Sequence, residues 1–364
     1  MTFYSVTNIS PNIQFKGYNN PVFRNTPPNL NSKSLLSELQ TDTVCISEKK
    51  ENQGKKENSS KANNWGIVAL SLLSFGALVC ALTKDKNCVT QVKKTLSEFR
   101  PAKTTDEAKS FAQKTLNVNY LDENKANLDM INTVNEWLYK EKFIAEKNIP
   151  EFVHFTEKNI ENPLHLTDKI IKDGKGYNAL GVNVNYINKF EDLITLAFNP
   201  KSEIKLNQLI KKNSDNVYEI VKPEYKCENL EKLVNKLNTY NKNSSFKDKM
   251  EIYDGIGEAI SYLRNIQAGK NVKMSNFSSD GAFLHEMGHL LHQDSYKMYS
   301  SAKEGAKICQ EFINNEGKIA QKVSDYATNS PLEFVAETYK HLRRGETFSD
   351  DIINLYKKYN GPPI

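Results

Sequence analysis

Histidine and glutamate residues with the spacing of a metal site occur near position 285. The stretch His285-Glu286-Met287-Gly288-His289 has the pattern H-E-x-x-H. On a helix, positions four residues apart share a face, so both imidazoles can face one metal ion. Two histidines and one carboxylate hold Zn²⁺ and leave the fourth tetrahedral position open for water. The pattern therefore predicts a zinc site, with the glutamate between the histidines as the general base.

A helix is expected to carry this motif. The apolar residues around it repeat with a helical period and predict a buried stripe opposite the histidines: Phe283, Leu284, Met287, Leu290 and Leu291. Ser278, Ser279 and Asp280 offer N-caps, so the helix should begin near residue 280. Gly288 costs roughly 1 kcal/mol relative to alanine in a helix interior, which indicates that another element packs closely there.

The third ligand does not lie directly after the motif. Metzincins would need glycine at 292 and histidine at 295, but the chain has His292 and Ser295, which excludes that class. His292 lies two helical turns from His285. We therefore interpret His292 as a polar residue at the helix end and not as a ligand.

Two glutamates about forty residues later are the candidates for the remaining ligand. Ser330 is a predicted N-cap, Pro331 fits the first helical position, and Gly345 is a predicted helix stop. Glu333 and Glu337 are four apart on this helix, which suits one ligand and one carboxylate that holds a ligand histidine. Two alternatives stay open: Ser330 and Glu333 also fit a capping box, and Glu337 also fits a solvated helix face.

The two motifs together resemble a known family. The core H-E-x-G-H, followed by SDYATNSPLEFVAE over residues 324–337, is similar to the zinc peptidase domain of anthrax lethal factor and the related Pro-Pro endopeptidases. In that family a tyrosine lies seven residues before the carboxylate ligand, as Tyr326 does before Glu333. The resemblance covers roughly residues 278–345. The family's substrate-binding parts do not align with this chain, so no specificity is implied.

The resemblance implies a role for each matching residue. It implies a zincin fold, one Zn²⁺ ion and a peptide or protein substrate. The implied zinc ligands are His285, His289 and Glu333. Glu286 would be the general base, Tyr326 would donate to the developing oxyanion, and Glu337 would hold a ligand histidine from behind.

Composition limits the other classes of function. The chain has 364 residues and a formal net charge of +5, from lysines scattered along its length. Because there is no basic stripe and no nucleic-acid-binding motif, we expect no nucleic-acid partner. The five cysteines are Cys45, Cys80, Cys88, Cys227 and Cys309. Their odd number and wide spacing predict neither a disulfide framework nor a metal cluster.

The N-terminal part is expected to differ from the rest. Residues 1–63 are rich in Asn, Ser, Lys and Pro, which predicts a disordered tail. Residues 65–83 contain no charge and approach the roughly twenty residues that cross a bilayer. We expect a transmembrane helix over 64–84, in preference to a buried core helix or a signal-peptide core, and a linker over 85–103. A single-pass membrane protein follows. Lysines on both flanks leave the side of the catalytic domain unresolved, and the extracytoplasmic side is favoured over the cytoplasmic one.

Residues 104–364 are expected to form one zincin-like α+β domain, mostly helical with a small sheet. Apolar periods predict helices near 108–116 and 128–143, helical pieces through 228–266, and a connecting helix over 303–322. Residues 180–186 and 193–198 are predicted strands. One strand could be the sheet edge on which an extended peptide lies.

The combined expectation is a membrane-anchored zinc metalloendopeptidase. Its partners would be a protein or peptide substrate and, through residues 65–83, a lipid bilayer. Two alternatives remain. One is a toxin-like zinc protease effector, which the resemblance permits. The other is a non-catalytic, membrane-tethered binding protein with a zincin fold, against which the presence of Glu286 argues.

Overall fold

The computed structural model of the chain describes residues 45–46, 99–157, 163–172, 175–199, 206–293 and 302–364. The described chain divides into two compact units. Of the described residues, one unit comprises those within 45–155 and 169–179, and the other comprises those within 156–168 and 180–364. Residues 104–364, expected as one domain, contribute to both units. Apart from 45–46, the predicted tail over 1–63 lies outside the described residues.

A five-stranded sheet has the order β1-β4-β5-β3-β2. Its strands are β1 (Cys45–Ile46), β2 (Asn119–Leu121), β3 (Phe152–Thr156), β4 (Leu164–Lys172) and β5 (Lys175–Asn183). β2 and β3 run parallel, with Tyr120 opposite Val153, and β1 and β4 also run parallel. The structure thus contains the small sheet that was predicted.

The smaller unit contains two helices. They are α4 (Thr105–Phe111), which continues as a π-helical turn over Ala112–Leu116, and α5 (Leu128–Tyr139), which continues as another over Lys140–Ile144. A short 3₁₀ turn (Glu123–Lys125) precedes α5. Asn127 caps α5 by accepting the Met130 N–H at 2.9 Å. Ala108, Ile131 and Val134 are fully buried between these helices and their neighbours, as the apolar period predicts.

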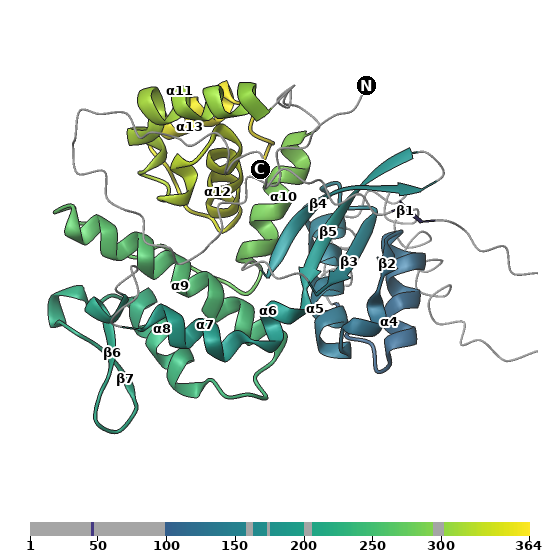
Figure 1. Cartoon of the computed structure of the whole chain (residues 1–364), viewed down its shortest axis with the longest axis horizontal. Coiled ribbons are helices and arrows are strands. Elements are labelled where there is room, and N and C mark those ends of the chain that lie inside the picture. Colours follow the sequence, from purple (N-terminus) through teal and green to yellow (C-terminus); the bar gives the residue numbers. More distant parts are fainter. Residues whose placement is uncertain (1–44, 47–98, 158–162, 173–174, 200–205, 294–301) are drawn as a thin grey trace, which may run out of the picture. The chain divides into compact units, whose positions relative to one another are not determined.

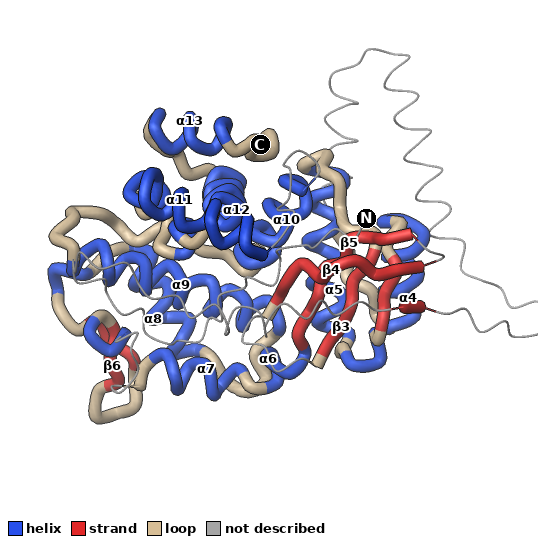
Figure 2. Tube along the Cα trace, turned by 45° about the horizontal axis from the view of Figure 1, so that its top comes forward, coloured by secondary structure: helices blue, strands red, loops and turns tan. Residues whose placement is uncertain are grey.

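The larger unit is mainly helical (Figure 2). Its longer elements are α6 (Val184–Asn188), α7 (Phe190–Ala197), α8 (Glu228–Thr239), α9 (Phe246–Gln267), α10 (Gly281–Gln293), α11 (Ala302–Ala320), α12 (Pro331–Arg343) and α13 (Asp350–Lys358). A two-stranded antiparallel hairpin consists of β6 (Ile210–Lys212) and β7 (Tyr218–Ile220). The 3₁₀ turns are Leu206–Gln208, Pro223–Tyr225 and η7 (Tyr326–Thr328).

One predicted strand is wrong. Residues 193–198 form most of helix α7 and its C-cap instead. Phe190, Leu193, Ile194 and Ala197 are buried at positions i, i+3, i+4 and i+7 and pack into the core shared with α8 and α9. A short apolar run has no period of its own, so packing partners decide between strand and helix. The other predicted strand is β5, which ends at Asn183 because that side chain accepts the Tyr186 N–H and begins α6.

The predicted membrane helix requires a correction. A bilayer-crossing helix needs about twenty mainly apolar residues. Among the described residues, no helix is both that long and that apolar. Helices α9 and α11 have 22 and 19 residues, but both carry charged residues along one face. The expectation of a transmembrane helix and of a single-pass membrane placement is therefore not supported, and residues 65–83 lie outside the described residues. The fold class is corrected to α+β, mostly helical with a small sheet, with no bilayer-spanning helix among the described residues.

Helices α10 and α12 pack directly against each other (Figure 1). The contact is closest at Gly288, where a side-chain carbon would lie only 2.8 Å from the Ala336 Cα atom. This confirms the prediction that another element packs closely at Gly288. Since one helix carries the H-E-x-x-H motif and the other carries both glutamates, the contact brings the two predicted motifs together.

Candidate metal centre

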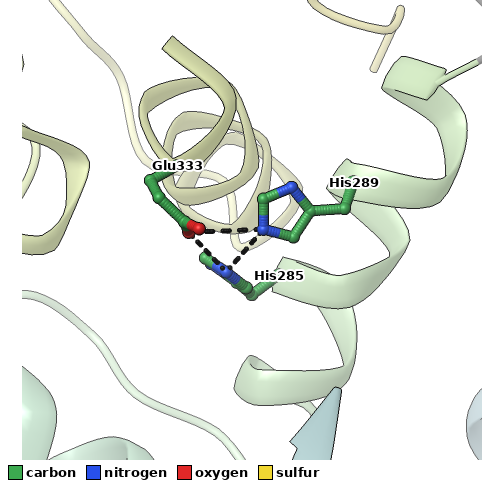
Figure 3. A group of neighbouring side chains, drawn as sticks. All are labelled: His285, His289 and Glu333. Atoms are coloured by element: carbon green, nitrogen blue, oxygen red, sulfur yellow. Dashed lines mark hydrogen bonds and ion pairs between the residues drawn. The ribbon is translucent and has the colours of Figure 1, made fainter. Parts of the chain in front are cut away.

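Helix α10 presents its two motif histidines toward α12. The helix begins at Gly281, as predicted from the candidate caps, and the Leu284 N–H donates to the Asp280 carbonyl at 2.8 Å. His285 is 8% exposed and His289 is half-buried. Both rings point to the same place on α12 because they stand one turn apart on a single face (Figure 3).

Three ligand-type atoms meet between the two helices. His285 Nε2 and His289 Nε2 are 3.1 Å apart, and Glu333 Oε2 lies 3.2 Å from the first and 3.3 Å from the second (Figure 3). A tetrahedral ion with ligands at about 2.05 Å separates them by about 3.3 Å. The three atoms therefore have the mutual spacing of three corners of such a tetrahedron, and this buried group can hold a metal ion.

The carboxylate oxygen in this group has no hydrogen bond. Glu333 Oε2 is buried and, despite its short distances to both imidazoles, it accepts no hydrogen bond of acceptable geometry. A buried acceptor without a donor is costly, and most such atoms in proteins have a partner. A cation between the three atoms would be that partner.

The cap of α12 explains how Glu333 reaches the group. Ser330 Oγ accepts the Glu333 N–H at 3.1 Å, and Pro331 follows as the first helical residue. The backbone part of the predicted capping box is therefore present. The Glu333 side chain, however, lies against the histidines, where it completes the metal-ligand group. Capping and metal binding use different atoms of this residue and do not exclude each other.

Glu337 lies behind His285. Its Oε1 atom is 2.8 Å from His285 Nδ1, so this ring nitrogen donates and Nε2 is left as the atom that faces the group. Glu337 is only 5% exposed, which is incompatible with a solvated helix face. The arrangement matches a carboxylate that orients a ligand histidine.

The two carboxylates at the site favour a positive charge there, which is a proton on His285 when no metal is bound and which a metal ion would displace. Burial lowers the pKa of His285, but the carboxylates of Glu333 and Glu337 outweigh burial and raise it to about 10. Burial raises the pKa of Glu333, yet the neighbouring imidazoles of His289 and His285 lower it to about 2. Glu333 is thus an anion at neutral pH, which is the form that binds metal.

Tyr326 borders the same group from the turn η7. Its ring centroid is 5.5 Å from that of His285, with the planes inclined by 53°. Burial and the negative charges of Glu333 and Glu286 raise the pKa of Tyr326 well above 10. Its phenol therefore keeps its proton at neutral pH and can donate. Glu286, on α10, is half-buried beside the histidines and close enough to act on this phenol electrostatically.

An ion pair holds the turn that carries Tyr326. Arg264, near the end of α9, pairs with Asp325, the residue before Tyr326. Within the turn, Ser324 Oγ accepts the Ala327 N–H at 3.0 Å, and the Thr328 hydroxyl donates to the Asp325 carbonyl at 2.6 Å. The orientation of the tyrosine is therefore set from both the turn and α9.

His292 is separate from the metal-ligand group, as predicted. It lies at the end of α10, where it is 1% exposed and its Nε2 donates to the Tyr359 carbonyl at 2.7 Å. Burial lowers its pKa to about 4, so the ring is neutral at neutral pH. His292 joins α10 to the residue that follows α13.

A group of ionisable residues behind Glu337 was not predicted from the sequence. Their side chains are buried and come from α9 and from α12 with its C-cap: the charged Asp254, Glu258, Lys340 and Arg344, with the imidazole of His341 beside them. The only signal along the chain was the spacing of Lys340, three residues after Glu337 on one helix face. Such a pair is usually a solvent-exposed one, so the spacing did not indicate burial.

Comparisons with protein-family models, with curated proteins and with solved structures give no match.

Proposed function

We propose that this protein is a zinc-dependent metallopeptidase that hydrolyses peptide bonds in a protein or peptide. The observation that carries the proposal is the triangle of His285 Nε2, His289 Nε2 and Glu333 Oε2, with mutual separations of 3.1 to 3.3 Å. The choice of a peptidase among hydrolases rests on the H-E-x-x-H pattern with Tyr326 and on the family resemblance of these motifs.

The donor set fits zinc. Two imidazole nitrogens and one carboxylate oxygen are the ligand types of catalytic zinc sites, and three protein ligands leave one position for water or substrate. Calcium and magnesium prefer six or more oxygen ligands, which this group does not offer. Zinc, when bound, would supply the Lewis acidity that makes a water acidic and polarises a carbonyl group.

Glu286 is the proposed general base. It lies between the two histidines in sequence, so its side chain projects from the same helix beside the metal-ligand group. A carboxylate there can take a proton from the attacking water and deliver it to the leaving amine. The ligand group consists of His285, His289 and Glu333, so the proposed base differs from the three ligands.

Tyr326 is the proposed oxyanion donor. Its phenol keeps its proton because burial, Glu333 and Glu286 all raise its pKa. A hydrogen bond from such a donor grows stronger as the carbonyl oxygen gains negative charge, so it stabilises the transition state more than the substrate. The loss of one such donor costs about 10²–10³-fold in kcat.

Metal analysis of the purified full-length chain, together with digestion of a peptide library, tests the proposal. The parent should contain close to one zinc ion per chain and should cleave peptides. Glu286→Gln should keep the zinc and lose cleavage, because it removes the base and leaves the ligands. His289→Ala should lose both.

Two results would contradict the proposal. A parent protein that binds no zinc at neutral pH would refute the metal assignment. Parent-like cleavage by Glu286→Gln would refute the mechanism, even with zinc present. A zinc-containing parent that cleaves no member of a broad library would instead favour a binding protein that keeps the metal site without turnover.

A further inference from the structure

Four charged side chains lie buried behind Glu337, and each of them forms an ion pair with a side chain of opposite charge. Lys340 and Glu258 are 7% and 3% exposed as residues. The Arg344 and Asp254 side chains are 4% and 6% exposed. They come from two helices, since Asp254 and Glu258 lie on α9 whereas Lys340 and Arg344 lie on α12 and at its C-cap.

These side chains form one continuous chain of contacts that ends at the metal-ligand group. Lys340 Nζ lies 3.0 Å from Glu337 Oε2 and 3.0 Å from Glu258 Oε1. Arg344 Nη1 lies 3.3 Å from the same Glu258 oxygen, and Arg344 also pairs with Asp254. His341 Nε2 borders the chain at 3.7 Å from Glu258 Oε1. Beyond Glu337, the next contact is His285 Nδ1 at 2.8 Å.

The same chain of side-chain contacts reaches the start of α10, the helix that carries the H-E-x-x-H motif. Arg344 donates to the Ser278 hydroxyl at 3.2 Å and to the Asn276 carbonyl at 3.1 Å, both in the segment before α10. Asp254 accepts the Ser278 N–H at 3.0 Å. The buried charges therefore connect α9, α12 and the beginning of α10, which together frame the metal-ligand group.

Stability alone is a poor reason for this arrangement. Ion pairs lose their hydration on burial, so apolar residues of similar volume often stabilise a core as well or better. The four outer residues also carry no formal net charge, because Lys340 and Arg344 balance Asp254 and Glu258. They can therefore orient Glu337 while adding little net charge near the metal-ligand group.

We infer that this chain of buried ion pairs positions the metal ligand His285 through Glu337, with Lys340 and Glu258 as positioning residues. The inference rests on the proposed zinc function. Glu337 uses one oxygen for His285 and the other for Lys340, so Lys340 determines which way the carboxylate faces. Glu258 in turn holds Lys340 in place from α9. Without Lys340, the carboxylate could rotate and His285 would no longer be held in one orientation.

A charge-matched double variant tests the inference. Lys340→Met alone leaves the buried carboxylates of Glu258 and Glu337 without the cation between them, which can prevent folding. The double variant Lys340→Met/Glu258→Gln removes one charge of each sign, which keeps the outer charge balanced, and it still lacks the contact to Glu337. Loss of a partner that orients a metal-bound histidine typically costs 10- to 100-fold in metal affinity. We expect the double variant to bind zinc about tenfold more weakly than the full-length parent.

Two readouts separate positioning from a purely structural role. Zinc affinity is measured by chelator competition well below the unfolding temperature of each variant. The absorption bands of the cobalt-substituted protein report the geometry of the ligands, and these bands should shift in the double variant. Lys236→Met is the matched control, because Lys236 also bridges two carboxylates, Asp248 and Glu251, at a half-exposed place away from the site. Its zinc affinity and spectrum should equal the parent's.

The outcomes distinguish the inference from the proposed function. A parent that binds zinc, with a double variant of equal affinity and unchanged cobalt spectrum, overturns the inference and leaves the proposed function intact. A parent that binds no zinc overturns the proposed function, and the inference falls with it. Weaker binding in Lys236→Met as well would assign the effect to general destabilisation and would also overturn the inference.

Discussion

The closest approach of α10 and α12 allows a test that leaves every proposed ligand in place. Gly288 lies between the two motif histidines, and an added Cβ atom would stand 2.8 Å from Ala336 Cα and 3.2 Å from the Ala336 carbonyl oxygen. Ordinary carbon contacts begin at 3.4 Å. Both nearby atoms are backbone atoms, so no side-chain rotation can relieve the contact. Gly288→Ala should push the two helices apart by about 0.6 Å.

This displacement would disturb the ligand triangle. The contacts from Glu333 to the two histidines, now 3.2 and 3.3 Å, would lengthen to about 3.8 and 3.9 Å, beyond the spacing of about 3.3 Å that a tetrahedral zinc ion requires. Stability responds to two opposing effects. Alanine gains about 1 kcal/mol in helix propensity, and overpacking costs about 1–3 kcal/mol. We expect a loss of up to about 2 kcal/mol in the free energy of unfolding and a zinc affinity at least tenfold weaker.

Two other helical glycines provide the control. Gly257 on α9 and Gly317 on α11 have no atom within 4 Å of an added Cβ. Gly257→Ala and Gly317→Ala should therefore each stabilise the protein by about 0.5–1 kcal/mol and leave zinc affinity unchanged. Urea denaturation of the metal-free proteins gives the stabilities, and chelator competition gives the affinities. If Gly288→Ala were as stabilising as Gly257→Ala and bound zinc like the parent, the close packing of α10 on α12 would be refuted.

Further predictions concern single residues at or near the site. In chelator competition, Glu333→Gln should lose most zinc affinity and Glu337→Gln should lose 10- to 100-fold; the reverse order would make Glu337 the ligand. Tyr326→Phe should lower kcat for peptide cleavage about 10²–10³-fold at unchanged zinc content, and an unchanged kcat would remove it from the mechanism. Arg264→Gln, which frees the turn before Tyr326, should lower kcat by less and should also leave zinc content unchanged. His292, with its pKa lowered to about 4, binds its proton more readily when the chain is unfolded. The metal-free protein should therefore lose stability as pH falls from about 6.5 to 4, by up to about 3 kcal/mol from this residue, and urea denaturation of His292→Gln should show a correspondingly smaller loss.

The sequence alone determined the elements that carry the site. Helices α10 and α12 were predicted from an apolar period, a cap and a stop, and the structure places them at 281–293 and 331–343. The cap and the stop act within one or two turns: the Ser330 hydroxyl accepts an N–H from three residues away, and Gly345 has the positive φ of 82° that ends a helix. Such local hydrogen bonds and steric preferences do not depend on the rest of the fold, so a reader of the sequence can infer them.

Tertiary structure decided which side chains meet. Residues 193–198 became helical because α8 and α9 offer a surface for one helical face, which no local signal could indicate. His292 is buried because Tyr359, 67 residues away, supplies an acceptor. Glu337 and His285 are 52 residues apart, and Lys340 meets Glu258 from another helix. The contrast has one physical reason: caps and periods act over a few residues, whereas the metal-ligand triangle and the ion pairs behind it exist only where α9, α10 and α12 pack together.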